Sequence, residues 1–340
     1  MIQGTTLHVA IPAMNEAESL PRTIDCLLKQ TVQEVQIWVC VNQPDAWWND
    51  PLKQPLCENN LHTLDYLNQL DLTNLHVLDH CSPGKGWQGK NAGVGQARKT
   101  IMDAIDRVAS ERDIMVSLDA DTLVGKDYLA CIQQNLNDHP QAAGISVPYY
   151  HQLSGKETLD RAMLRYEIYM RHYAINMWII GSPYSFTALG SAIALPVSAY
   201  RKIGGMTPKK SGEDFYLLQK LRKTGRLINT NPCWVFPGTR FSDRVFFGTG
   251  PALIKGSQGN WESYPVYDHQ LFLQVKETYN LFPALYNEDL PTPMSDFLQE
   301  QFRCENIFQA LRVNSRTSAQ FVKACHHRID GLRVLQFLKS

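Results

Sequence analysis

The chain has 340 residues, of which 44% are hydrophobic and 19% are charged, a composition typical of folded proteins. Lysine and arginine together number 33, as do aspartate and glutamate, so no net charge draws the protein to nucleic acid or to an acidic surface. The first residues lack the basic and apolar segments of a signal peptide, and proline, glycine and asparagine interrupt the most apolar stretch, residues 173–195. We therefore expect a cytoplasmic protein that can touch the inner face of a membrane peripherally.

Cysteine usage fits this expectation. The eight cysteines are irregularly spaced, and no two form a C-x-x-C motif. Cys26 and Cys40 lie in apolar runs, where a free cysteine behaves as a small hydrophobic residue. Cys325 is followed by two histidines but by no second pair of metal ligands. We expect reduced thiols throughout.

Short apolar segments alternate with amphipathic ones through the first half of the chain. The expected strands comprise residues 7–11, 35–41, 75–78 and 114–118. A helix is predicted after the first strand, with Asn15 as its N-cap and Glu18 completing a capping box. A longer helix before the fourth strand would carry Ile101, Ile105 and Val108 on one face.

The second half is less regular. A helix is predicted over residues 157–173 and a short strand over 192–195. Another helix would begin near Gly212 and end at Gly225, in the left-handed conformation that glycine adopts easily. From about residue 256 the composition becomes aromatic and polar, and then helical.

Strands that alternate with helices predict an α/β fold with a Rossmann-like, mainly parallel sheet flanked by helices. In such sheets ligands bind at the carboxyl ends of the strands, where Pro12, Asn42 and Asp119 are expected. The predicted organisation is a domain at 1–255, made of two halves at 1–125 and 126–255, and a mostly helical extension at 256–340.

The sequence Asp119-Ala120-Asp121 follows the fourth strand directly. Two carboxylates one residue apart can bind one hard cation, Mn2+ or Mg2+, which shares its oxygen ligands with substrate phosphates. A turn, or a cap on the next helix, is the alternative for Asp121. The position after an apolar strand favours the metal.

Ser211-Gly212-Glu213-Asp214 also allows two readings. Ser211 and Asp214 have the spacing of a capping box before an apolar helix. Alternatively, Asp214 is a general base that takes the proton of an acceptor hydroxyl, kept ionised by the helix dipole.

Basic side chains near glycine-rich loops are candidates for phosphate binding. The loop at residues 84–91 and the helix that follows supply Lys90 and Arg98, although no P-loop motif is present. Arg240 and Arg244 precede a second glycine loop and could hold a departing diphosphate. An exposed loop with incidental charges is the alternative for this second pair.

Taken together, these motifs resemble glycosyltransferase family 2, whose members have the GT-A fold. The resemblance covers roughly residues 5–250. The matching segments, in chain order, are Ile11-Pro12-Ala13-Met14-Asn15-Glu16, Asp119-Ala120-Asp121, Gly190-Ser191-Ala192-Ile193-Ala194, Ile203-Gly204-Gly205 and Gly212-Glu213-Asp214.

The resemblance implies a metal-dependent, inverting transfer from a nucleoside diphosphate sugar to an acceptor that the sequence does not identify. Asp121, with Asp119, would hold the metal, and Asp214 would be the base. The donor would contact Pro12, Ala13, Asn15, Glu16, Asn42, Lys90, Arg98, Asp119, Ala120 and Asp121. The sugar and acceptor would contact Gly190, Ser191 and Glu213, and the diphosphate Arg240 and Arg244. The family often carries an aspartate at the position of Asn42, which leaves the role of this residue open.

The sequence leaves two other functions open. A sugar nucleotidyltransferase has related chemistry but begins with a glycine-rich, arginine-containing loop that this chain lacks. A non-catalytic nucleotide-sugar-binding or scaffold protein could share the fold, although the retained carboxylates argue against it.

Overall fold

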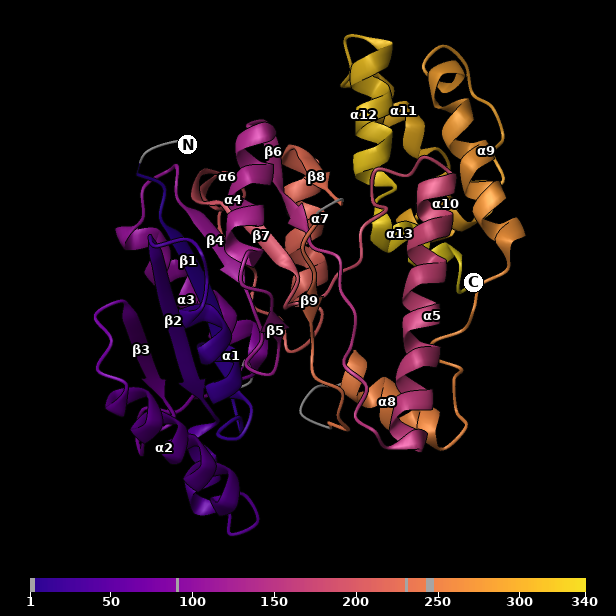
Figure 1. Ribbon diagram of the computed structural model, residues 1–340. Coiled ribbons are helices and arrows are strands. Elements are labelled where there is room, and N and C mark those ends of the chain that lie inside the picture. The colour runs from indigo at the N-terminus through magenta and orange to yellow at the C-terminus, as the bar shows by residue number, and fades with distance from the viewer. Residues whose placement is uncertain (1–3, 90–91, 230–231, 243–247) are drawn as a thin grey trace. The chain divides into compact units, whose positions relative to one another are not determined.

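The computed structural model describes residues 4–89, 92–229, 232–242 and 248–340 (Figure 1). The chain forms two compact units. Unit 1 comprises Met1–Tyr166 and Ala188–Trp261, and unit 2 comprises Glu167–Thr187 and Glu262–Ser340. The helix α5, Glu157–Ile179, contributes residues to both units.

Unit 1 is built on a seven-stranded sheet of order β3-β2-β1-β4-β7-β6-β8. β1 pairs in parallel with β2 and β4, whereas β7 is antiparallel to both of its neighbours. A second, two-stranded sheet pairs β5 with β9. The strands are β1 Leu7–Ala13, β2 Val35–Asn42, β3 Leu75–His80, β4 Ile114–Ser117, β5 Leu123–Val124, β6 Ala142–Ser146, β7 Ile193–Pro196, β8 Arg226–Ile228 and β9 Val235–Phe236. The mixed α/β fold with a mostly parallel sheet is therefore confirmed.

Helices flank this sheet. α3 packs on β1 and β2, and α7 packs on β6 and β8. The helical elements of unit 1, apart from its share of α5, are α1 Leu20–Leu28, η1 Asp45–Asn49, α2 Gln54–Gln69, α3 Val94–Val108, α4 Tyr128–Asp138, α6 Val197–Lys202, α7 Glu213–Thr224 and α8 Thr249–Ser257.

β1 lies near the middle of the sheet, and all seven of its residues are buried. The strand does not stop at Pro12, as the sequence suggested, but continues to Ala13. The ladder with β4 covers only Leu7 to Ala10. Pro12 therefore lies beyond the part of β1 that is paired on both sides, where a missing N–H is tolerated.

Two predicted helix details are wrong. α1 begins at Leu20 and not at Asn15, because the Asn15 backbone is left-handed, with φ 59°, and its N–H donates to the Asn60 side chain at 2.7 Å. Gly225 is extended, with φ −171°, and a Cβ there would lie 3.0 Å from the Ala143 Cβ, so close packing explains this glycine. Val108 is not part of the buried face of α3, since it is 67% exposed at the last turn.

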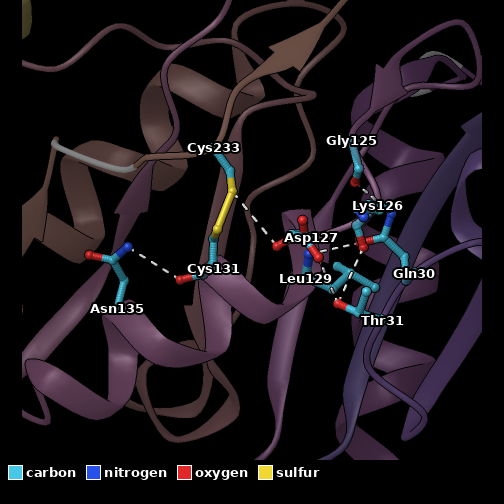
Figure 2. The surroundings of a disulfide bond; sticks show 9 residues. All are labelled: Gln30, Thr31, Gly125, Lys126, Asp127, Leu129, Cys131, Asn135 and Cys233. Carbon is cyan, nitrogen blue, oxygen red and sulfur yellow. Dashed lines mark hydrogen bonds between the residues drawn. A yellow bond between two sulfur atoms is a disulfide. The ribbon is translucent and has the colours of Figure 1, made fainter.

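The expectation of reduced thiols is also wrong for one pair. Cys131 on α4 and Cys233, just before β9, form a disulfide with a Cα–Cα distance of 6.3 Å (Figure 2). The Cys233 sulfur also lies 3.7 Å from the Asp127 carbonyl oxygen. The partners are 102 positions apart, so only the fold brings them together. The bond contradicts the expectation of reduced thiols, which was one ground for the expected cytoplasmic location.

The other cysteines are free. Cys304 is exposed, whereas Cys325 on α12 is buried.

A buried polar cluster surrounds His8 near the beginning of β1. The Trp38 indole N–H donates to His8 Nδ1 at 3.2 Å, and His8 Nε2 lies 3.6 Å from the Asp113 carboxylate. Since Nδ1 accepts a hydrogen bond, the proton of the neutral ring is on Nε2. Burial lowers the pKa of His8, although Asp113 acts in the opposite direction.

Unit 2 is helical. Apart from its share of α5 it contains α9 His269–Leu285, α10 Ser295–Phe302, α11 Ile307–Val313, α12 Ser318–Arg328 and α13 Gly331–Phe337. Phe272, Phe282 and Phe321 are fully buried and form part of its core. Within the residues described, none of the helices combines the length and the apolar character needed to span a bilayer.

Candidate active site

The carboxyl ends of three parallel strands meet at one edge of the sheet in unit 1. β1 ends at Ala13, β2 at Asn42, and β4 leads into Asp119. Open α/β sheets bind ligands at this edge. The carboxylates predicted from the sequence lie here, together with two arginines from distant parts of the chain.

Arg98 is the centre of the first group. It lies on α3 and is only 1% exposed. Its Nη2 donates to Asp119 Oδ1 at 2.5 Å, and its Nη1 donates to Glu213 Oε1. A buried guanidinium needs such compensation, because an unpaired charge in the interior is strongly destabilising. These ion pairs raise the pKa of Arg98 although burial opposes them.

The partners of Arg98 in the structure differ from those that the sequence suggested. The side chain binds carboxylates inside the protein, whereas the sequence placed it against donor phosphates. It links the Asp-x-Asp segment with the start of α7, although Arg98 and Glu213 are 115 positions apart.

Gly190 provides the space for the Arg98 guanidinium. A Cβ at this position would lie 2.5 Å from Arg98 Nη2 and 2.9 Å from its Cζ. The Gly190 carbonyl also accepts a hydrogen bond from the Ser117 hydroxyl at 2.6 Å, which ties it to the end of β4. The glycine is therefore required by close packing inside the site.

The Asp-x-Asp segment is a turn held from α1. The Thr122 N–H donates to the Asp119 carbonyl at 3.1 Å, and the Thr23 hydroxyl lies 2.9 Å from the Ala120 carbonyl and 3.2 Å from that of Thr122. The turn that the sequence offered as an alternative is thus present. It is compatible with a ligand role, because the Asp119 and Asp121 side chains are 35% and 19% exposed.

Arg240 is the centre of the second group. Its Nη1 donates to Glu16 Oε2 at 2.8 Å, and its Nη2 donates to Glu16 Oε1 and lies 3.0 Å from Asp121 Oδ2. A Cβ on Gly238 would lie 3.1 Å from the Asp121 carboxylate, so this glycine lets the segment pass close to it. The pKa of Arg240 is raised by these carboxylates against the effect of burial. Arg240 therefore forms ion pairs with both Asp121 and Glu16.

Glu213 and Asp214 begin α7. The N-cap position is occupied by Gly212, whose φ is 72°, so Ser211 does not form the capping box. Asp214 Oδ1 accepts a hydrogen bond from the Phe215 N–H at 2.7 Å. Burial raises the pKa of both carboxyl groups, that of Glu213 to about 7, while Arg98 lowers both.

Burial thus acts on the Asp214 pKa against the helix dipole and Arg98, both of which favour the ionised carboxylate. A carboxylate with a raised pKa is the stronger base.

Asn42 has structural partners on both sides. It is 2% exposed, its amide donates to the Ala13 carbonyl at 2.9 Å, and its carbonyl oxygen accepts from the Trp87 indole at 3.2 Å. The Trp87 ring stacks on His80 with centroids 4.0 Å apart. The residue that the sequence assigned to the nucleotide thus joins β1, β2 and the following loop.

The glycine loop itself is organised by Asp45. Its carboxylate accepts hydrogen bonds from the Gly84 N–H at 2.9 Å and the Gly86 N–H at 3.3 Å. In this structure those two amides therefore bind a side chain of the protein. Lys90 and Arg244, which the sequence also assigned to phosphate binding, lie outside the described residues.

Three hydroxyl groups next to the predicted motifs are buried with no hydrogen-bond partner in the described part of the chain. They belong to Thr122, Ser191 and Thr239. Buried polar groups are normally satisfied, so unpaired ones adjoining Asp121, Gly190 and Arg240 are suited to a polar ligand.

The donor set suits one divalent cation bound jointly with a substrate. No group of three or more His, Cys, Asp or Glu side chains that could hold a metal occurs among the residues described. Mg2+ and similar ions, however, are commonly bound by one or two carboxylates together with substrate phosphates and water. Asp119 and Asp121 fit that pattern, and the site is rich in negative charge, with five carboxylates around two guanidinium groups.

Thr23, Trp87 and Gly238 were missed by the sequence reasoning. Each acts on a distant partner: Thr23 on the Asp-x-Asp turn, Trp87 on Asn42, and Gly238 on Asp121. The only local signals were a tryptophan between glycines and a glycine shortly before Arg240.

No known protein-family model matches the chain, and no curated protein sequence does. Among solved structures it is similar to S. aureus TarS 1-349 in complex with UDP-GlcNAc, with 14% identity and a TM-score of 0.49 over 98% of this chain and 84% of that one.

It is also similar to the mannosyltransferase PcManGT from Pyrobaculum calidifontis in complex with GDP-Man and Mn2+, with 16% identity and a TM-score of 0.41 over 98% and 78% of the two chains. GalNAc-T7 with UDP, GalNAc and Mn2+ shares 15% identity and a TM-score of 0.47 over 90% and 56%. At such identities and TM-scores, the function has to be inferred from the residues of the chain itself.

Proposed function

We propose that the chain is a glycosyltransferase, which moves a sugar from a nucleoside diphosphate sugar to the hydroxyl of an acceptor. The observation that carries the proposal is the buried Arg98, which binds Asp119 after β4 and Glu213 at the start of α7. Arg98 thereby holds the start of α7, where Asp214 follows Glu213, close to the Asp-x-Asp segment whose carboxylates suit a cation. Family 2 with its GT-A fold is the family whose motifs the chain resembles, and we propose membership in it.

The base of the reaction is Asp214. Burial raises its pKa, which makes the carboxylate a better proton acceptor, while the neighbouring Arg98 favours the ionised form. A hydroxyl that loses its proton to Asp214 becomes the nucleophile that attacks the sugar carbon. Direct displacement of the nucleoside diphosphate inverts that carbon, as the resemblance to the family implies.

Negative charge grows on the diphosphate as the bond to the sugar breaks. Asp121, together with Asp119, would hold Mn2+ or Mg2+, which supplies positive charge to the diphosphate when bound. Arg240 lies beside Asp121 and adds a guanidinium that can turn from carboxylate to phosphate, both of which accept bidentate hydrogen bonds.

The other candidate residues are assigned to the nucleotide or to the sugar and acceptor by their position in the fold. The nucleotide would lie along the strand ends at Pro12, Ala13 and Asn15. The sugar and acceptor would lie by Ser191, whose buried hydroxyl has no partner among the described residues. We assign the nucleotide to the half of the chain at 1–125 and the acceptor to that at 126–255.

The decisive experiment compares Asp214→Asn with the wild type. With a panel of nucleotide-sugars and Mn2+, the variant should release nucleoside diphosphate at least about a hundredfold more slowly, since general acid–base catalysis contributes about 10²–10⁴-fold. Its donor affinity should change little. Asp138→Asn, at an exposed position of α4, is the matched control. Near-normal turnover of the Asp214 variant would remove that residue from the role of base.

The same panel separates the competing functions. Release of pyrophosphate would identify a nucleotidyltransferase, and donor binding without turnover would identify a non-catalytic binding protein. Chelation should abolish turnover and Mn2+ should restore it, whereas full activity in excess chelator contradicts the metal assignment.

A further inference from the structure

Three side chains of unit 2 form a compact cationic group at the ends of two helices and within a third. Phe302 is the last residue of α10, Arg328 is the last residue of α12, and Arg333 lies on α13 (Figure 1). The Arg328 guanidinium carbon is 4.0 Å from the centre of the Phe302 ring, and that of Arg333 is 5.0 Å from it. Two positive charges are therefore held against one ring.

These arginines differ from others in unit 2. Arg171 pairs with Glu167 at 2.5 Å, and Arg312 pairs with Asp289 at 2.5 Å. Within the described residues, no carboxylate lies within ion-pairing distance of either arginine of the Phe302 group.

The contacts described for the two guanidinium groups are to neutral atoms. The Asp330 carboxylate caps α13 and accepts a hydrogen bond from the Arg333 backbone N–H at 3.3 Å. Arg333 Nη1 donates to the neutral side-chain oxygens of Gln336 at 2.5 Å and Gln301 at 3.5 Å. The carbonyl end of α12 favours one positive charge at Arg328, but it does not account for a second guanidinium on the same ring. The ring stabilises each cation only modestly at an exposed site.

The surrounding sequence is also basic. Residues 303–340 contain seven lysines and arginines and only two acidic residues, Glu305 and Asp330. The preceding stretch, 262–302, contains one lysine and seven acidic residues. Positive charge is thus concentrated in the part of unit 2 that carries the arginine pair, and such an asymmetry favours an anionic partner.

We propose that Arg328 and Arg333 bind a phosphate group, as a monoester or a diester, at a site distinct from the sugar-transfer site. Each guanidinium offers a planar fork of donors that matches phosphate oxygens. A phosphate has enough oxygens and charge for both forks, whereas a single carboxylate has only two oxygens. Stacking on Phe302 holds the forks in place before binding, which lowers the entropic cost of ordering them.

The test is a calorimetric titration with inorganic phosphate. Arg328→Gln/Arg333→Gln should weaken binding by about tenfold for each lost charge-assisted interaction. Arg316→Gln, which removes one exposed charge from the same basic stretch, should leave the affinity unchanged. Arg328→Lys/Arg333→Lys keeps both charges but loses the planar forks, so it should bind phosphate several-fold more weakly than the wild type. This variant provides the test if the double glutamine variant does not fold.

Vesicles distinguish the sources of the phosphate. If vesicles of phosphatidylglycerol sediment the wild type and not the double glutamine variant, while phosphatidylcholine vesicles sediment neither, the phosphate belongs to a lipid headgroup. If only inorganic phosphate distinguishes the variants, the phosphate belongs to a soluble ligand. Equal phosphate affinity in the wild type and in both double variants, or an equal loss in Arg316→Gln, overturns the proposal. None of these outcomes depends on sugar transfer.

Discussion

Replacement of Gly190 by alanine tests the organisation of the candidate active site most directly. The new methyl group would lie 2.5 Å from Arg98 Nη2, 2.9 Å from Cζ and 3.0 Å from Nη1. A flexible exposed arginine would move away, but Arg98 is buried and bound to Asp119 and Glu213. Either the methyl group strains the backbone at Gly190, which precedes β7 and is hydrogen-bonded to Ser117, or the Arg98 guanidinium loses one of its carboxylate partners.

The expected cost follows from these alternatives. Overpacking of a well-filled interior costs about 1–3 kcal/mol, and breaking a buried ion pair costs about 3–5 kcal/mol. We therefore expect Gly190→Ala to lower the free energy of unfolding by about 3 kcal/mol. Because Asp119 would shift with its partner, turnover should also fall by about a hundredfold, the loss typical of a 1 Å misplacement.

Urea unfolding and the release of nucleoside diphosphate measure the two effects. Gly125→Ala is the matched control, because a Cβ there meets nothing within 4 Å. The control should be neutral or stabilised by up to about 1 kcal/mol through the lower entropy of its unfolded chain. If Gly190→Ala is as stable and as active as the control, Arg98 is not fixed in the way the structure indicates.

Three further outcomes are expected. Thr23→Val should cost about 1–3 kcal/mol in urea unfolding and reduce turnover, because it leaves carbonyls of the Asp-x-Asp turn without their buried donor; unchanged unfolding and turnover would contradict this. The pKa of His8 is lowered from 6.5 in the folded state, so folding favours the neutral ring and stability should fall as the pH drops below about 6.5. His8→Gln should flatten the pH dependence of the unfolding free energy between about pH 7 and pH 5. If urea titrations give the same dependence for the variant and the wild type, His8 is not its source. Cys131→Ser/Cys233→Ser should lose up to about 4.7 kcal/mol of unfolding free energy, the value for a closed loop of about 100 residues. A reductant should lower the melting temperature of the wild type and of the control Cys304→Ser by the same amount. If the reductant leaves the melting temperature unchanged, the bond does not stabilise the fold.

The sequence by itself determined the character of the sheet and the placement of two carboxylates at the end of one of its strands. Apolar runs buried on both faces, separated by amphipathic segments, encode parallel strands with helices between them, because both periods are local properties of the chain. The positions of Asp119 and Asp121 follow in the same way, since they come directly after the buried strand β4. Helix ends were less predictable, as Asn15 shows, because its N–H is bound by the side chain of Asn60 on another helix.

The tertiary structure alone decided which groups meet. Arg98 finds Glu213 across 115 positions, Arg240 finds Glu16 across 224, and Cys131 finds Cys233 across 102. A sequence pattern shows that a residue is buried or charged, but not which distant partner compensates it. Gly190 is the clearest case: its lack of a side chain has no local reason, and only the guanidinium that the fold places against it explains the glycine.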